Sequence, residues 1–308
     1  EIERVVSSFV RNNRALAGVI FALTSSTLYG ITPVFVHMAY DRGADPFGLM
    51  TARYAISLVV LLAVRFARVG LRNWPDRKTS TQLFLLGALG LYLNGVCVFS
   101  AMERMDSGLM MVIFYHYPIV VVFLGWWFYG QRPARVIWPC LVATIGGVAL
   151  TASDVSSAQS SGVLIILAGA LVYSVYQVIG ARVMPRTDLL TGLWIVFAGA
   201  GFSFATMWLL DPPGIESTMP ANAIAWMAAG EIAVIGTVMA MGAFFAGMKN
   251  SAVIQTFEVI VTIGMGIAFL NESLTGRQVL GTVCILGGVA VLARAESRRE
   301  AAMSPQVP

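Results

Sequence analysis

The sequence contains little charge. Only 12% of its 308 residues are charged, about half the share of a typical soluble domain, while 57% are hydrophobic and the mean hydropathy is +0.77. A soluble core could not enclose this much apolar side chain, whereas a bilayer can. The composition therefore predicts an all-α integral membrane protein.

The residue types that most often carry reaction chemistry are also scarce. Cys97, Cys140 and Cys284 lie within apolar segments and show no metal-ligand spacing, His37 and His116 are the only histidines, and no aspartate lies deep in an apolar segment. An intramembrane enzyme would need paired aspartates or a His/Glu metal set, which the sequence lacks. No phosphate-binding loop is present, which argues against a primary pump. We expect no metal, no cofactor and no enzymatic activity.

Long apolar segments make up most of the chain. Each is roughly 20 residues long, the length that crosses about 30 Å of hydrocarbon. The predicted transmembrane helices cover residues 15–36, 47–65, 82–102, 107–129, 134–152, 161–181, 189–210, 222–247, 251–270 and 275–293.

The two ends of the chain differ from these segments. In residues 1–14, hydrophobic side chains recur at helical spacing beside three arginines, which predicts an amphipathic helix on the cytoplasmic membrane surface; disorder is the alternative. Residues 295–308 are polar and are expected to form a disordered cytoplasmic tail.

Basic residues indicate the orientation, because Lys and Arg concentrate on the cytoplasmic side. With the N-terminus inside, sixteen of the twenty lie in inner segments, Arg42, Arg104 and Arg277 lie in outer loops, and Arg53 lies within a span. This alternation predicts a multi-pass protein of the plasma (inner) membrane with both termini cytoplasmic. The net charge of +4 therefore does not indicate nucleic-acid binding; the expected partners are membrane lipids and a small-molecule substrate.

The sequence also repeats itself. Gly18, Val19, Leu23, Tyr29 and Val34 recur as the same residue types 144 positions later, and the sequence GGVA at 146–149 recurs at 287–290. Chance similarity between apolar segments is the alternative. Duplication predicts two five-helix repeats, residues 15–152 and 161–294. Because five is odd, the second repeat would be inverted, as in secondary transporters whose substrate site lies where the repeats meet.

Several short motifs resemble those of the drug/metabolite transporter (DMT) superfamily, specifically its EamA-type family. They are PFGLMTARY at 46–54, YHYP at 115–118 and FLNESLTGRQVLGTVCILGGVAVL at 269–292. Gln131 stands where the family usually has glutamate, and Val259 where it often has proline. The resemblance implies a secondary carrier with a central cavity walled by both halves, often an exporter of amino acids or other small metabolites.

Polar residues at helical spacing predict which faces line this cavity. In the ninth span, Gln255 and Glu258 belong to a polar stripe on one helical face, although helix–helix hydrogen bonding could also explain it. In the first and sixth spans, Tyr29, Tyr173 and Tyr176 occupy related positions. Asn94 in the third span is a further candidate substrate contact.

Ionisable groups inside spans are costly and usually face protein or water. Arg53 and Glu231 lie at similar depths and are predicted to form a structural ion pair, with binding of a substrate carboxylate as the alternative. His116 and Glu258 lie near mid-membrane. We interpret His116 as a substrate contact, with a packed, hydrogen-bonded histidine as the alternative, and Glu258 as the proton-coupling group.

Two further features concern motion and the outer surface. Pro33 and Pro118 fall inside the first and fourth spans and are candidate hinges, because each removes a backbone hydrogen bond. Glu272 lies at an outer end and is interpreted as a capping or packing residue.

The predicted function is secondary active transport, with export of a small organic metabolite such as an amino acid by alternating access. Export of lipophilic cations or drugs is the alternative substrate class, a proton-independent facilitator the alternative mechanism, and a channel or intramembrane enzyme the alternative protein class.

Overall fold

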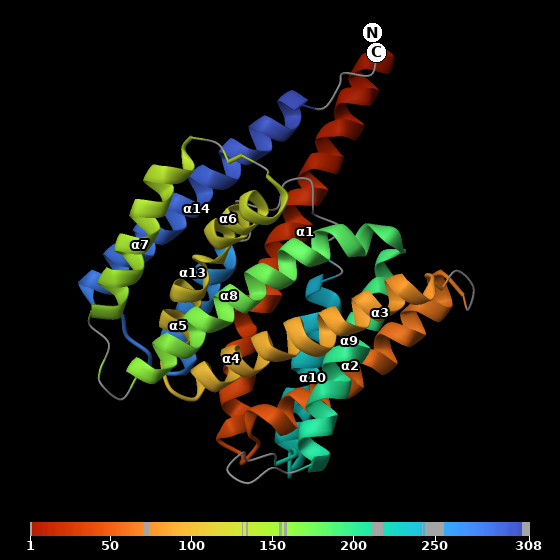
Figure 1. Cartoon of the computed structure of the whole chain (residues 1–308), viewed down its shortest axis with the longest axis vertical. Helices are drawn as coiled ribbons and strands as arrows, with labels where there is room; N and C mark the ends of the chain where they lie inside the picture. Colours follow the sequence, from red (N-terminus) through yellow and green to blue (C-terminus); the bar gives the residue numbers. More distant parts are fainter. Residues whose placement is uncertain are drawn as a thin grey trace.

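The computed structural model describes most of the chain (Figure 1). The described residues are 2–70, 74–130, 132–133, 135–153, 156, 159–210, 218–241, 243 and 256–303, with side chains from residue 19 to residue 295. Over these ranges every regular element is a helix and no strand is formed. The fold is therefore all-α, as the composition predicts.

The structure describes the following helices. They are α1 (Ile2–Tyr40), α2 (Pro46–Arg68), α3 (Arg77–Leu85), η1 (Leu86–Leu91), α4 (Tyr92–Met102), α5 (Ser107–Phe114), α6 (Tyr117–Tyr129), α7 (Ile137–Ser153), α8 (Ser160–Val183), η2 (Met184–Arg186), α9 (Leu189–Leu210), α10 (Ala223–Ala233), η3 (Val234–Met239), α13 (Thr256–Phe269) and α14 (Gly276–Met303).

Seven helical stretches of the described chain are long and apolar enough to cross a membrane. They are Val19–Tyr40, Pro46–Arg68, Arg77–Met102, Ser107–Tyr129, Ser160–Arg186, Leu189–Leu210 and Gly276–Ala295. The other three predicted spans coincide with shorter apolar helices, Ile137–Ser153, Ala223–Met239 and Thr256–Phe269. A multi-pass membrane protein is thus supported, and the number ten stays a prediction.

Local sequence explains where helices begin and end. The carboxylate of Asp45 accepts hydrogen bonds from the amides of Phe47 (2.8 Å) and Gly48 (2.9 Å), and Pro46 occupies the first position of α2, where its missing N–H costs nothing. The same carboxylate accepts from the Thr218 amide, and Gly48 lies against the Thr218 carbonyl too closely for any side chain. One aspartate therefore both starts α2 and joins the two halves of the chain.

Among the described residues, regular α-helical hydrogen bonding is interrupted in the middle of three apolar spans. The fourth predicted span divides into α5 and α6 at Tyr115 and His116, just before Pro118. The other two interruptions are the π-helical segments η1 and η3, neither of which contains a proline. Pro33, by contrast, lies inside an uninterrupted α1. Of the two candidate hinges, only Pro118 marks a break in the structure, and the role of both as hinges stays a prediction.

Packing between the halves follows a paired pattern. The contacts within one group of helices recur within a second group. In the first group, α1 packs on α13 and η3 packs on α2. In the second group, α8 packs on α6 and η1 packs on α9. The pairs α2–α9 and α7–α14 each join one half to the other, and Figure 1 shows both pairs side by side. This is the pattern that a two-fold relation between the halves produces.

Hydrogen bonds repeat the pattern. The Ser25 hydroxyl donates to the Ala240 carbonyl (2.8 Å), joining α1 to the residue after η3. The Asn94 amide donates to the Gly169 carbonyl (3.2 Å), joining α4 to α8. Gly169 is the position related to Ser25 by the repeat of 144 residues, so equivalent helix pairs are joined with donor and acceptor exchanged.

The ends of the chain depart from the predicted boundaries. α1 begins at Ile2 and continues into the first span without a break, and a surface position for residues 1–14 stays a prediction. α14 extends to Met303, so the prediction of a disordered tail from residue 295 is wrong for most of that tail. The Ala-, Glu- and Arg-rich sequence there consists of strong helix formers, which explains the extension. The start of α1 and the end of α14 lie at the same end of the molecule (Figure 1).

Glu272 connects the segment after α13 to the start of α5. Its carboxylate accepts hydrogen bonds from the Ser107 amide (2.7 Å), the Ser107 hydroxyl (2.7 Å) and the Gly108 amide (3.0 Å). These amides are the first donors of α5 and have no partner within the helix. The interpretation of Glu272 as a capping residue is confirmed.

Replacing this cap should destabilise the protein. Glu272→Ala leaves two α5 amides without a partner, so we expect a loss of about 1–2 kcal/mol in the free energy of unfolding, measured by denaturation in detergent. Glu103→Ala is the control, because its exposed ion pair with Arg104 (3.0 Å) should contribute little. Equal effects of the two substitutions would contradict the capping role.

The topology can be tested with single cysteines in a variant lacking the native three. Ser156 and Ala221 are exposed at the end of the molecule where α2 begins, and Lys78 is exposed at the opposite end. Ser156→Cys and Ala221→Cys should react with an impermeant thiol reagent added to whole cells, and Lys78→Cys should react only after permeabilisation. Labelling of all three in intact cells would contradict the predicted orientation.

Candidate functional site

Tyrosine rings from both halves gather at the junction of α6 and α8. The Tyr117 and Tyr173 rings meet edge to face at 4.9 Å between centroids, and the Tyr173 and Tyr176 rings stack at 5.7 Å. Phe114 adds a ring 5.4 Å from both Tyr117 and Tyr173. The predicted tyrosines Tyr173 and Tyr176 are therefore brought together, with Tyr117 as a third member from the first half.

Tyr29 belongs to the same region. It is half-buried on α1 and lies within electrostatic range of Glu258, Arg53 and Tyr176. Gly30 beside it packs so closely on Val261 that an added Cβ would come within 2.7 Å, which holds α1 against α13. The structure thus places the predicted residues of the first, sixth and ninth spans around one junction.

Glu258 is joined to this cluster through Tyr115. The Tyr115 hydroxyl donates to the Glu258 carboxylate at 2.8 Å, and the Tyr115 ring lies 5.8 Å from that of Tyr117. His116, interpreted as a substrate contact, has its Nδ1 2.6 Å from the Ile113 carbonyl, in the turn between α5 and α6. The histidine therefore hydrogen-bonds the backbone at the break, and the adjacent tyrosine reaches the carboxylate.

Arg53 does not form the predicted ion pair. Its Nε donates to the Thr237 hydroxyl at 2.9 Å, and its guanidinium lies 5.6 and 5.7 Å from the ring centroids of Tyr54 and Phe99. Both carboxylate oxygens of Glu231 are buried without a hydrogen-bond partner among the described residues. The prediction of a direct Arg53–Glu231 pair is wrong, because η3 places Thr237 at the guanidinium instead.

Asn94 and Gln255 are the other two predicted substrate contacts. Asn94 is buried, and its amide is engaged with the Gly169 carbonyl, so in this structure it makes a contact between helices. Gln255 lies outside the described residues.

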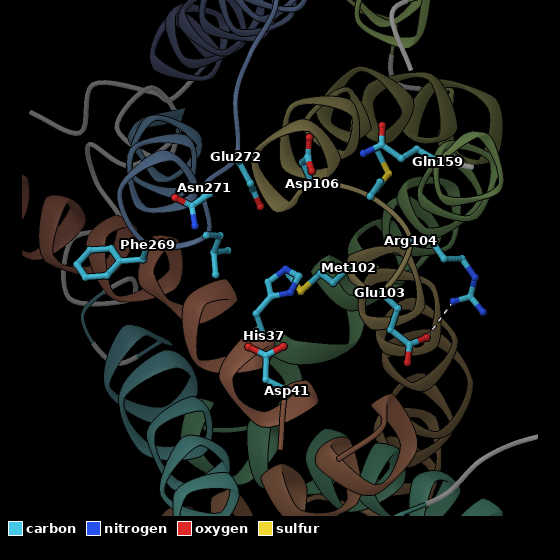
Figure 2. Close-up of a pocket in the computed structure, with 12 residues that line it drawn as sticks. His37, Asp41, Met102, Glu103, Arg104, Asp106, Gln159, Phe269, Asn271 and Glu272 are labelled. Atoms are coloured by element: carbon cyan, nitrogen blue, oxygen red, sulfur yellow. Dashed lines mark hydrogen bonds and ion pairs between the residues drawn. The ribbon is translucent and has the colours of Figure 1, made fainter. Parts of the chain in front are cut away.

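A pocket of about 480 Å³ opens at the end of the molecule where α2 begins (Figure 2). His37 and Asp41 line it from the end of α1, Glu103 and Arg104 from the end of α4, and Glu272 from the segment after α13. In Figure 2, Glu272 points toward His37 across the pocket, and a dashed line joins Glu103 to Arg104.

Acidic groups outnumber basic ones in this pocket, because Asp106 lines it as well. Burial raises the pKa of Asp106, and the nearby Glu272 carboxylate raises it further. A pocket lined mainly by acidic groups attracts cations, including ammonium groups, and disfavours anions.

The groups gathered at the site are suited to binding a solute. Within the described ranges, no group of three or more His, Cys, Asp or Glu side chains is placed to hold a metal ion. The cluster instead offers aromatic faces, phenolic hydroxyls, one guanidinium and two carboxylates. These groups suit a small organic solute with an apolar or aromatic body and a charged end.

Sequence reasoning missed Tyr115, Tyr117 and Thr237. The two tyrosines flank His116 in the YHYP motif, so their types and positions were visible, but the turn at the break decides which of the three side chains reaches Glu258. Thr237 gave no signal, since a lone threonine in an apolar segment is ordinary and its position depends on η3.

Comparison with known proteins agrees with this architecture. The model of the EamA-like transporter family matches residues 16–153 and again residues 160–294. The chain is 25% identical over 289 residues to the uncharacterized transporter YcxC of Bacillus subtilis, covering 88% of this chain and 90% of that protein.

Two further relatives and one structure are similar. Protein PecM of Dickeya dadantii is 24% identical, covering 72% of this chain and 76% of PecM. The uncharacterized transporter sll1319 of Synechocystis is 23% identical, covering 66% of this chain and 63% of that protein. One solved crystal structure has a TM-score of 0.59 at 20% identity, covering 92% of this chain and 98% of the other, a likeness of fold alone.

The two successive matches of one family model account for the internal repeat, and two of the three relatives carry the name of a transporter. The chain belongs to the EamA-like transporter family.

Proposed function

We propose that the protein is a secondary active transporter that exports a small organic metabolite, such as an amino acid, by alternating access. The observation that carries the proposal is the junction at which Tyr115, Tyr117 and Glu258 meet Tyr173 and Tyr176. These residues come from both halves, and a site shared between repeats can be exposed to either side when the halves move relative to each other.

The charges near the junction suit a solute with groups of both signs. The Arg53 guanidinium is held by Thr237 and neighbouring rings rather than by a carboxylate, and Glu231 is buried with no hydrogen-bond partner among the described residues. A bound ammonium and a bound carboxylate would give Glu231 and Arg53 charged partners, which favours binding of such a solute. The tyrosine faces would contact the rest of the solute.

The acidic pocket supports the same proposal. A solute that carries an ammonium group is favoured there, whereas a solute with only negative charge is disfavoured. The pocket and the tyrosine faces would also accommodate a lipophilic cation, which is the second candidate substrate class.

Transport can be tested in proteoliposomes loaded with unlabelled amino acids. Uptake of single radiolabelled amino acids should show saturable counterflow, with labelled tetraphenylphosphonium as the probe for the alternative. Flux that rises without saturation would indicate a channel, and the absence of counterflow with every probe would contradict the proposal.

Removing a ring should weaken binding. Tyr173→Ala deletes contacts with the Tyr117 and Tyr176 rings, so the half-saturation concentration for the transported probe should rise about 3- to 10-fold. Tyr173→Phe, which retains the ring and loses only the hydroxyl contact with Gln177 (3.1 Å), should have a smaller effect. Tyr129→Ala, at the far end of α6, is the control. Unchanged transport by Tyr173→Ala would place the substrate elsewhere.

Proton coupling is assigned to Glu258. Glu258→Gln removes the exchangeable proton but retains the shape of the side chain, so transport should no longer respond to a pH gradient while counterflow persists. Glu231→Gln makes the same chemical change at a carboxylate without a tyrosine donor and should retain the pH response. A Glu258→Gln protein that still follows the gradient would indicate a facilitator independent of this group.

A further inference from the structure

Two π-helical segments occupy related places in the two halves. η1 (Leu86–Leu91) lies in the third span of the first half, and η3 (Val234–Met239) lies in the third span of the second. Each has six residues. Because a π-helix bonds each amide one residue further back than an α-helix does, it is rarely stable without outside support and often lies at functional sites.

A serine of the opposite half supports each segment. The Ser203 hydroxyl of α9 donates to the carbonyl of Ala88 within η1 at 2.8 Å. The Ser57 hydroxyl of α2 donates to the carbonyl of Ala233, which immediately precedes η3, at 3.3 Å. The serines are 146 positions apart and the acceptors 145, close to the interval of the internal repeat. The two contacts are therefore equivalent and join the halves reciprocally.

Glycines bring the two segments close to neighbouring helices. Gly87 of η1 lies directly on the Val196 carbonyl of α9, and Gly199 of α9 lies on the Phe84 carbonyl, both too close for a side chain. Gly236 of η3 lies against the Thr32 side chain of α1. At Gly87 and Gly199 the two helices therefore meet backbone to backbone.

Both segments also touch the site. Thr237 of η3 accepts the hydrogen bond from Arg53 and donates to the Ile232 carbonyl at 2.6 Å, a carbonyl five residues earlier. Gly90 of η1 faces Tyr176, where an added Cβ would lie 3.1 Å from the ring. A change of helical register in either segment would therefore move a group that contacts the site.

We propose that η1 and η3 are the paired hinges of the transport cycle, and that Ser203 and Ser57 are positioning residues that set the balance between the two orientations of the site. The proposal rests on alternating access as the proposed function. Since the halves are related by an inverted two-fold, weakening the hinge of one half favours opening at one end of the molecule, and weakening the other favours the opposite end.

The test measures distances between spin labels on the full chain in lipid nanodiscs and needs no substrate. One label pair, at Ser156 and Ala221, reports the pocket end, and a second, at Lys78 and Arg135, reports the opposite end. Ser156 and Arg135 flank α7, while Ala221 and Lys78 belong to the spans that carry η3 and η1. Each wild-type pair should show two distance populations.

Ser57→Ala and Ser203→Ala should change the ratio of these populations in opposite directions, each by roughly fivefold, the effect of one net hydrogen bond. The double variant should return close to the wild-type ratio. Ser57→Thr and Ser203→Thr retain the hydroxyl and should behave as the wild type. Ser153→Ala, which removes a hydroxyl bonded to its own helix, is the matched control.

Shifts in the same direction would show that the serines only stabilise the fold and would overturn the proposal. A single wild-type distance at both ends would overturn it without any serine variant. Failure of the proposed function is distinguishable, because it would appear as absent counterflow in proteoliposomes while the label distances still show two populations.

Discussion

Hydrocarbon offers no hydrogen-bond partners, so every backbone carbonyl in a span must be satisfied within the protein. At the departures from regular α-helix inside the described spans, side chains meet this requirement for several carbonyls. His116 approaches the Ile113 carbonyl at the break between α5 and α6, Ser203 donates to Ala88, Ser57 donates to Ala233, and Thr237 donates to Ile232. Several polar side chains in the spans therefore hydrogen-bond the backbone. Other polar side chains, together with the tyrosine rings, form the site.

The same constraint governs the buried charges. Arg53 is satisfied by a hydroxyl, a thioether 3.7 Å away and two rings, and Glu258 accepts from a phenol. Each therefore has partners that leave part of its hydrogen-bonding capacity for another molecule. Glu272, in contrast, is fully engaged by the start of α5 and is structural. The contrast separates groups that hold the fold from groups that are available to a solute.

Much of the fold could be predicted, because hydropathy and the length of apolar segments can be read from the sequence alone. Spans, the internal repeat and the gathering of Tyr173, Tyr176 and Glu258 all followed from such one-dimensional patterns. Depth within a span could also be estimated, but not rotation about it. Arg53 and Glu231 therefore looked like partners, whereas η3 turns Thr237 toward the guanidinium.

The π segments could not be predicted, since no proline or other local residue marks them. The serines that donate to carbonyls in or beside them lie more than a hundred residues away. The contact between Tyr115 and Glu258 could not be predicted for a related reason. Helical periodicity is lost at the break between α5 and α6. The spacing of residues in the sequence therefore no longer predicts the direction in which their side chains point.

The reciprocal serine contacts have a consequence for the order in which the protein is assembled. Synthesis places η1 in the membrane long before Ser203 leaves the ribosome, so the Ala88 carbonyl lacks its hydroxyl donor during that interval. The first half therefore lacks this contact until α9 has been inserted, and its final packing forms only after synthesis has passed Ser203. A nascent chain arrested after α7 would still carry the Ala88 carbonyl without its hydroxyl donor.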